Sequence, residues 1–198
     1  MATQTSKIKI GVFGSVAGDM NTALPRAKEL GNILAKYSDS IIIITGACTG
    51  LPYIVAKEAH DAGVEVWGFS ATLDKDSQNA LHPNDDNTIY DQIFYVESDF
   101  KFASSQRVNF KYRNVLSTAT CDAGIFISGR WGTLNEFTDL IDFQKIAGVL
   151  TGTGGIADEL PELTRIVNKE GQGKIIFNDD PEVLVQQILT ELGFPKTV

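Results

Sequence analysis

The chain has 198 residues, of which 43% are hydrophobic and 21% charged, and its formal net charge is −8. These values are typical of one globular domain, and we expect a single domain over residues 1–198. Because nucleic acids and anionic membranes would be repelled by a field of the same sign, we expect neither as a partner.

The sequence offers no membrane, secretion or metal signal. No apolar run approaches the roughly 20 residues that span a bilayer, and the N-terminal sequence enters a strand pattern without the apolar block of a signal peptide. Cys48 and Cys121 are too few for a disulfide framework and lack metal-ligand spacing, and His60 and His82 are isolated. We therefore expect a cytoplasmic protein with reduced thiols, no metal and no cofactor.

The first half of the chain alternates short apolar strands with amphipathic helices. The pattern predicts strands over 7–14, 40–46 and 65–71, and helices over 23–37 and 50–63. Residues 72–92 form an irregular stretch rich in Asp, Asn and Ser. A loop of this length is usually a lid, a binding loop or an oligomer contact.

The second half repeats the alternation. It predicts strands over 93–98, 122–129, 146–152 and 174–179, and helices over 104–120, from 132 and from Asp180-Pro181. Strands that alternate with helices in this way are typical of a parallel sheet covered on both faces. We predict an α/β fold: a Rossmann-like doubly wound sheet, mostly parallel, with about seven strands and helices on both faces.

Three predicted strands end in loops that contain glycine and lead into helices: "FGSVAGD" (13–19), "TGACTGLP" (45–52) and "SGRWGTLNE" (128–136). Sheets of this class bind ligands at the carboxyl ends of their strands, where free N–H groups of the following helices attract anions. None of the loops has the G-x-G-x-x-G or P-loop spacing, which disfavours a dehydrogenase or a Walker-type NTPase. Together the loops point to a site for a small anion.

The third loop leaves two interpretations of Glu136 open. Thr133 and Glu136 have the spacing of a capping box, in which each side chain bonds the backbone N–H of the other residue. Alternatively, Glu136 is a carboxylate that faces a ligand.

Trp131 in the same loop either stacks on a base or packs against a neighbouring subunit. Cys48 lies at a strand-to-helix turn, where a thiolate can be stabilised, but no histidine is near it in sequence.

The segment from 101 to 121 contains basic residues and no acidic one, a local reversal of sign: Lys101, Arg107, Lys111 and Arg113. On the predicted helix, the helical period puts Val108, Tyr112, Val115 and Ala119 on a buried stripe. Arg107 and Lys111 then lie on the outer face. Arg113 lies on the flank, where it either reaches a loop ligand or forms a structural ion pair.

"FKYRNVLSTATCDAGIFISGRWGTLNEF" (110–137) resembles the arginine-bearing helix and the Gly-Gly-x-Gly-Thr-x-x-Glu loop of the LONELY GUY (LOG) family, formerly mislabelled lysine decarboxylases. "GVFGSVAG" and "TGACTGLP" are similar to the family's first two loops, and the likeness runs over about 8–190. Arg113-Asn114 and "GFSA" are closer to the branch of this Rossmann-fold superfamily that includes molybdenum cofactor carriers.

The resemblance implies a pocket for a small phosphorylated ligand, either a nucleoside monophosphate or a pterin. It implies catalytic roles for Arg113 and Glu136 in hydrolysis of the N-glycosidic bond of a nucleoside 5′-monophosphate (a phosphoribohydrolase); the alternative is a non-catalytic carrier or sensor. It also implies a homodimer or higher homo-oligomer. The phosphate- or nucleotide-binding residues that it implies are Gly14, Ser15, Gly46, Gly50, Gly129, Arg130, Gly132 and Thr133.

The chain departs from the family pattern in two loops. Ser128-Gly129-Arg130 replaces the usual Pro-Gly-Gly, and Ala47 and Cys48 replace glycines of the second loop. Arg130 either adds a guanidinium to the phosphate site or fills the pocket.

Overall fold

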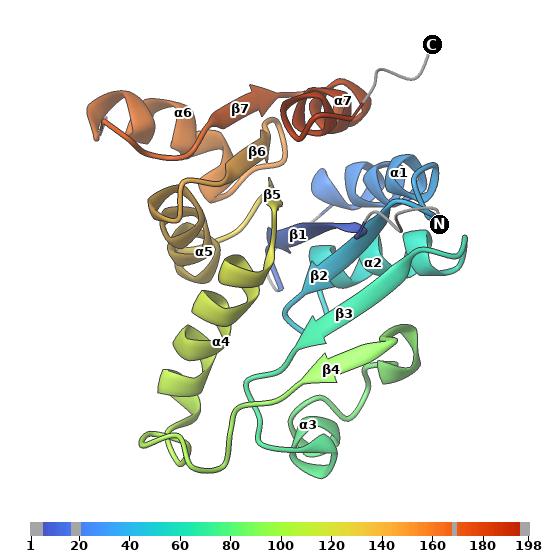
Figure 1. Cartoon of the computed structure of the whole chain (residues 1–198), viewed down its shortest axis with the longest axis vertical. Coiled ribbons are helices and arrows are strands. Elements are labelled where there is room, and N and C mark those ends of the chain that lie inside the picture. Colours follow the sequence, from blue (N-terminus) through green and yellow to red (C-terminus); the bar gives the residue numbers. More distant parts are fainter. Residues whose placement is uncertain (1–5, 17–20, 168–169, 195–198) are drawn as a thin grey trace.

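A computed structural model of the chain describes residues 6–16, 21–167 and 170–194. Residues 17–20, the end of the first glycine-bearing loop, lie outside the described residues. Seven strands form one sheet (Figure 1). They are β1 (Ile8–Gly14), β2 (Ile41–Thr45), β3 (Glu65–Phe69), β4 (Gln92–Phe94), β5 (Ala123–Ile127), β6 (Ile146–Leu150) and β7 (Ile175–Asn178).

The strand order is β4-β3-β2-β1-β5-β6-β7, and every neighbouring pair is parallel. The predicted Rossmann-like fold is therefore confirmed, with a sheet that is parallel throughout. From β1 the chain first builds the sheet toward β4 and then returns to place β5 on the other side of β1. This reversal creates a switch point between β1 and β5, where doubly wound sheets bind their ligands.

Helices cover both faces of the sheet (Figure 1). The helices are α1 (Ala23–Ala35), α2 (Leu51–His60), α3 (Lys75–Leu81), α4 (Gln106–Thr120), α5 (Trp131–Asp142), α6 (Ile156–Ile166) and α7 (Pro181–Glu191), with a 3-10 turn η1 (Asn87–Ile89). Helices α1, α2 and α7 pack on one face through one apolar core, and α5 and α6 on the other face through a second core. None of the described helices is long and apolar enough to cross a membrane.

The central strands are buried because helices lie on both sides of them. All five residues of β2 are buried, as are all five of β5. In β2, Ile41 and Ile43 face the core under α1 and α2, whereas Ile44 faces the second core with Phe13 and Phe126. The continuous apolar runs of the sequence correspond to this burial on both sides.

The structure contains two helices that the sequence reasoning did not assign. The irregular stretch 72–92 contains α3, which is capped by Asp74 accepting from the Ser77 N–H at 2.8 Å. Helix α6 connects β6 to β7 and has Pro161 inside it. Its amphipathic pattern is short and follows a run of glycines, which obscured it.

The predicted buried stripe of α4 is wrong. Val108, Val115 and Ala119 are exposed and Tyr112 is half-buried. The helix instead buries a polar face, made of Asn109, Arg113, Asn114, Ser117 and Thr118. Hydrogen bonds made by these side chains replace the apolar contacts that the periodicity predicted.

Candidate functional site

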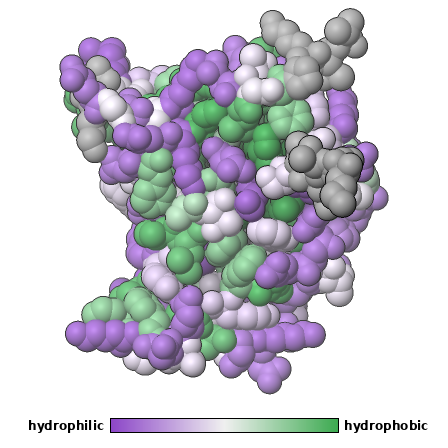
Figure 2. Space-filling model, viewed as in Figure 1, coloured by the Kyte–Doolittle hydropathy of each residue, from purple (hydrophilic) through white to green (hydrophobic). Residues whose placement is uncertain are grey.

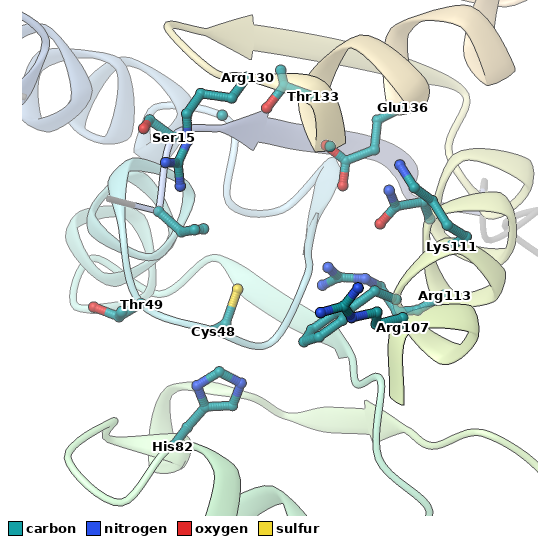
Figure 3. Close-up of a pocket in the computed structure, with 15 residues that line it drawn as sticks. Ser15, Cys48, Thr49, His82, Arg107, Lys111, Arg113, Arg130, Thr133 and Glu136 are labelled. Carbon is teal, nitrogen blue, oxygen red and sulfur yellow. The ribbon is translucent and has the colours of Figure 1, made fainter. Parts of the chain in front are cut away.

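A cavity of about 470 Å³ opens at the carboxyl ends of the strands, at the switch point between β1 and β5. Its lining comes from the loops after β1, β2 and β5, from the 72–92 segment and from α4 and α5 (Figure 3). This volume lies in the range of small-molecule sites. Figure 2 shows that hydrophilic side chains dominate the outline of the viewed face and that hydrophobic ones gather toward its middle.

The structure brings seven of the ten predicted site residues together on the cavity wall: Gly14, Ser15, Arg113, Arg130, Gly132, Thr133 and Glu136. Ser15, Arg130 and Thr133 lie on one side in Figure 3, opposite Arg107 and Arg113. The carboxylate of Glu136 points into the space between these two groups. The remaining three predicted residues, Gly46, Gly50 and Gly129, do not line the cavity.

Those three glycines shape the site from behind. A Cβ on Gly46 would overlap the guanidinium of Arg113, so Gly46 leaves the space into which Arg113 fits. Gly50 has φ +115°, and a Cβ there would lie 2.5 Å from the carbonyl oxygen of Ser15. Gly129 has φ +100° and packs against Thr133. These positions need glycine for backbone conformation or close packing.

The capping-box interpretation of Glu136 does not match the structure. Helix α5 begins at Trp131, with Arg130 as N-cap and no side-chain capping bond. Thr133 therefore lies inside the first turn, and no hydrogen bond or ion pair of the Glu136 carboxylate occurs within the described residues. The carboxylate is free to face the cavity.

Glu136 has an environment that changes its protonation. Only 8% of the residue is exposed. Burial raises the pKa of Glu136 to about 7, although the positive charges of Arg113 and Lys111 act in the opposite direction. A carboxyl group that titrates near neutral pH can both donate and accept a proton under physiological conditions.

Arg113 is held by backbone carbonyls and not by an acidic partner. Its Nη1 donates to the carbonyl oxygens of Gly46 and, at 3.4 Å, Phe69. Within the described residues Arg113 forms no ion pair. The structural ion pair that the sequence left open as one alternative is therefore not formed in this part of the chain. The residue is 8% exposed and its Nε has no hydrogen-bond partner in this part of the chain. A cationic group is thus fixed at the cavity wall by two backbone carbonyls.

Three further cations surround the cavity. Arg107 and Arg130 are exposed, and their side chains have no hydrogen bond or ion pair among the residues that the structure describes. Lys111, also exposed, lies on the outer face as predicted but lines the cavity. The cavity therefore has a local excess of positive charge in an acidic protein.

The unusual third loop has its own backbone conformation. Ser128 has φ +54°, and its N–H donates to Oγ1 of Thr153 at 2.8 Å. Proline has neither the N–H nor access to positive φ, so the family's proline cannot occupy this position without a change of backbone. Arg130 is extended, and its exposed side chain lines the cavity without closing it.

The sequence reasoning did not place several other lining residues in the site, including Thr49, His82, Phe110 and Asn114. His82 reaches the cavity from the 72–92 segment, and its Nδ1 lies 3.6 Å from Asp85, which also accepts from the Thr49 N–H at 2.8 Å. Only the irregular composition of the segment hinted at this contact. Asn114 could have been found from the polar residues that recur along α4.

Cys48 also lines the cavity. Burial raises the pKa of its thiol, and Arg113 only partly opposes this effect. The thiol is therefore protonated at neutral pH, which argues against a nucleophilic role. In the described part of the chain, no cluster of three or more His, Cys, Asp or Glu residues is arranged to hold a metal ion.

The fold and the cavity define a Rossmann-like protein with a cavity at the sheet's switch point. The family model described as the SLOG cluster4 family matches residues 7–185, so the chain belongs to that family. This confirms the LOG-like resemblance. No curated protein matches the chain.

Two solved structures show the same fold. TM1055 has a TM-score of 0.70 and 21% identity, covering 92% of this chain and 99% of its own. The molybdenum cofactor binding protein of the phototrophic bacterium Rippkaea orientalis has a TM-score of 0.67 and 18% identity, covering 94% of this chain and 98% of its own. This likeness agrees with the branch indicated by Arg113-Asn114.

A third likeness corrects the exclusion of nucleic acid as a partner. DNA processing protein A from Helicobacter pylori, described by its single-stranded DNA binding mode, has a TM-score of 0.61 and 20% identity, covering 94% of this chain and 80% of its own. The same fold therefore occurs in a DNA-binding protein. The prediction was wrong because net charge describes the whole molecule and does not describe the local field of a site.

Proposed function

We propose that the cavity binds a phosphorylated nucleoside and hydrolyses the N-glycosidic bond of a nucleoside 5′-monophosphate. The observation that carries this proposal is the environment of Glu136. Its carboxylate is buried, makes no capping hydrogen bond, and lines a cavity with Arg113 and other cationic side chains. A fixed carboxylate opposite a forming oxocarbenium ion is the central element of glycoside hydrolysis.

Each group has a role in this scheme. The phosphate would lie at the loops after β1 and β5, near Arg130 and Thr133, where N–H groups at the start of α5 attract anions. The ribose would face Glu136. Because the pKa of Glu136 is about 7, its ionised form can stabilise positive charge at C1′ and accept a proton from the attacking water.

The overall step is balanced. The bond between C1′ and the base nitrogen breaks with its electron pair remaining on the base. The bond between C1′ and the water oxygen forms, and the base takes up one proton as the water loses one. The products are the free base and ribose 5-phosphate. No oxidant or reductant is required.

Product analysis tests this proposal. We would incubate the protein with AMP, GMP, CMP and UMP and measure free base and ribose 5-phosphate by chromatography. We expect release from at least one substrate, with a loss of at least 100-fold in Glu136→Gln, because electrostatic groups of this kind contribute that much. Glu159→Gln, at an exposed position of α6, is the matched control. Equal release by Glu136→Gln and the unaltered protein would contradict the assignment.

A non-catalytic carrier or sensor is the second candidate, and two observations favour it. Ala47 and Cys48 replace glycines of the second loop, and the Rippkaea orientalis neighbour is a molybdenum cofactor binding protein by name. If a nucleotide or a pterin monophosphate raises the melting temperature and no product appears, the carrier is the correct function.

A further inference from the structure

One side of the cavity wall carries a hydrogen-bond acceptor without a partner. Asn114 lines the cavity and is 3% exposed. Its Nδ2 donates to Oδ1 of Asn135 at 3.1 Å, whereas its Oδ1 is buried and has no hydrogen-bond partner among the described residues. Asn135 does not line the cavity. The nitrogen of the Asn114 amide is therefore used on the protein side, and the oxygen of this cavity-lining residue has no partner in the described part of the chain.

The orientation of this amide is fixed by a chain of hydrogen bonds. The Asn135 Nδ2 donates to Oδ2 of Asp139 at 3.1 Å, one helical turn further along α5. An ionised carboxylate only accepts, so Asp139 requires the NH₂ group of Asn135, and the Asn135 oxygen then requires the NH₂ group of Asn114. Rotation of the Asn114 amide by 180° would place two oxygens against each other.

Another asparagine on α4 provides a comparison within the same helix. Asn109 is 2% exposed, and its Oδ1 also lacks a partner in the described part of the chain. Its Nδ2 donates to the Ala103 carbonyl at 2.9 Å. Asn109 does not line the cavity, and no carboxylate-anchored chain orients it. It matches Asn114 in burial and chemistry and differs in its position relative to the cavity.

We propose that Asn114 is a specificity residue whose amide oxygen accepts a hydrogen bond from a hydroxyl or N–H group of the bound nucleotide. Asn135 and Asp139 are positioning residues that hold this acceptor. Together with the carboxylate of Glu136, the acceptor makes this part of the cavity a site for donor groups, while the cations take the phosphate. The inference rests on the proposed function, because it requires a nucleotide in the cavity.

The test compares ligands that differ by one donor. Dissociation constants for AMP, 2′-deoxyAMP, 3′-deoxyAMP and purine riboside 5′-monophosphate would be measured by calorimetry for the unaltered protein, Asn114→Ala and Asn109→Ala. We expect the unaltered protein to bind one analogue about tenfold more weakly than AMP, the worth of one hydrogen bond. Asn114→Ala should bind that analogue and AMP equally, whereas Asn109→Ala should keep the tenfold difference.

Asp139→Asn supplies a variant that preserves shape and does not touch the ligand. An amide at this position can donate as well as accept, so the chain of bonds no longer imposes one orientation on Asn114. We expect the ratio of the dissociation constants of the analogue and AMP to fall at least twofold, whereas the melting temperature should change little.

Three outcomes contradict the proposals in distinguishable ways. If AMP and all three analogues bind the unaltered protein equally, the role of Asn114 is wrong and nucleotide binding stands. If Asn114→Ala keeps the discrimination, Asn114 has only a structural role. If no nucleotide binds, the proposed function is wrong, and this inference with it.

Discussion

Glu136 couples the chemistry of the cavity to the stability of the fold. In an unfolded chain a glutamate has a pKa of about 4.3, whereas burial raises the pKa of Glu136 to about 7 in the folded protein. Between these values the folded chain binds more protons than the unfolded chain. The contribution of Glu136 to the free energy of unfolding is therefore fully present below about pH 4 and decreases as the pH rises to about 7.

Glu136→Gln should abolish this pH-dependent decrease in the free energy of unfolding, because glutamine stays neutral at every pH. We expect the variant to exceed the unaltered protein by about 3 kcal/mol in free energy of unfolding at pH 8 and to match it near pH 4. Urea unfolding at several pH values measures the difference. Glu162→Gln serves as a control of opposite sign, since Arg165 lowers the pKa of Glu162. A gap that does not change with pH would contradict the assigned titration.

Gly46 tests whether Arg113 needs the space behind it. In Gly46→Ala the new Cβ would overlap the guanidinium, which must leave its bonds to the Gly46 and Phe69 carbonyls. We expect the free energy of unfolding, measured in urea, to fall by about 2 kcal/mol, because the hydrogen bonds that are lost are made by a charged donor.

A double-mutant cycle isolates this effect. In the Arg113→Ala background the guanidinium is absent, so Gly46→Ala should cost little more. Equal costs in both backgrounds would mean that the alanine disturbs the loop itself and does not act through Arg113.

At the scale of whole elements, the C-terminus of α4 depends on one lysine. Lys145, in the turn before β6, donates from Nζ to the carbonyl of Thr118 at 2.9 Å and also to those of Ala119 and Cys121. These carbonyls have no intrahelical partner at the end of a helix, and a cation there also interacts favourably with the helix dipole.

Lys145→Met should destabilise the fold by about 1–2 kcal/mol, because the stem stays packed while the donor is lost. Chemical denaturation gives this value directly. Lys174→Met removes a more exposed lysine that pairs with Glu191 at the surface, and we expect it to cost under about 0.5 kcal/mol. Equal costs for the two lysines would show that the cap of α4 contributes nothing specific.

The elements also show which features the sequence can predict. Strand β2 was found within one residue at each end, because five buried apolar residues between turn signals have few alternatives. The buried side of α4 could not be predicted by apolar periodicity, since it is polar and is stabilised by bonds to residues distant in the sequence, such as Gly46 and Asn135.

The candidate site also has parts that the sequence predicts and parts that it does not. Loops at the ends of parallel strands meet at one edge by topology, so Gly14, Arg130 and Glu136 were brought together as the pattern implied. His82 comes from a segment without a periodic pattern, and its position depends on contacts with Asp85. Whether a loop glycine faces the cavity or supports it, as Gly46 does, depends on side chains packed behind it.

For the whole molecule, the formal charge of −8 and the charge of the cavity have opposite signs. Four cationic side chains, those of Arg107, Lys111, Arg113 and Arg130, face the cavity, against the single carboxylate of Glu136. An anion approaching the protein is therefore repelled at long range and attracted only close to the cavity. Salt screens the two effects differently, because charges farther apart than the Debye length, about 10 Å at 0.1 M, are screened first.

This arrangement gives a specific salt dependence for AMP binding. We expect the affinity to change little from low salt to 0.1 M KCl, as screening weakens the long-range repulsion, and to fall at higher KCl as the local attraction is screened. Arg130→Gln should weaken binding about tenfold at 0.1 M KCl, consistent with the loss of one charge-assisted hydrogen bond. Calorimetric titrations at several KCl concentrations measure both effects.

Arg165→Gln is the matched control, because it removes the same charge at an exposed position where Arg165 pairs with Glu162 on α6, which does not line the cavity. It changes the net charge as Arg130→Gln does and leaves the cavity field intact. If both variants weaken AMP binding equally, the ligand responds to the charge of the whole molecule, and the cations of the cavity have no special role. If only Arg130→Gln weakens it, the local field determines what this acidic protein can bind.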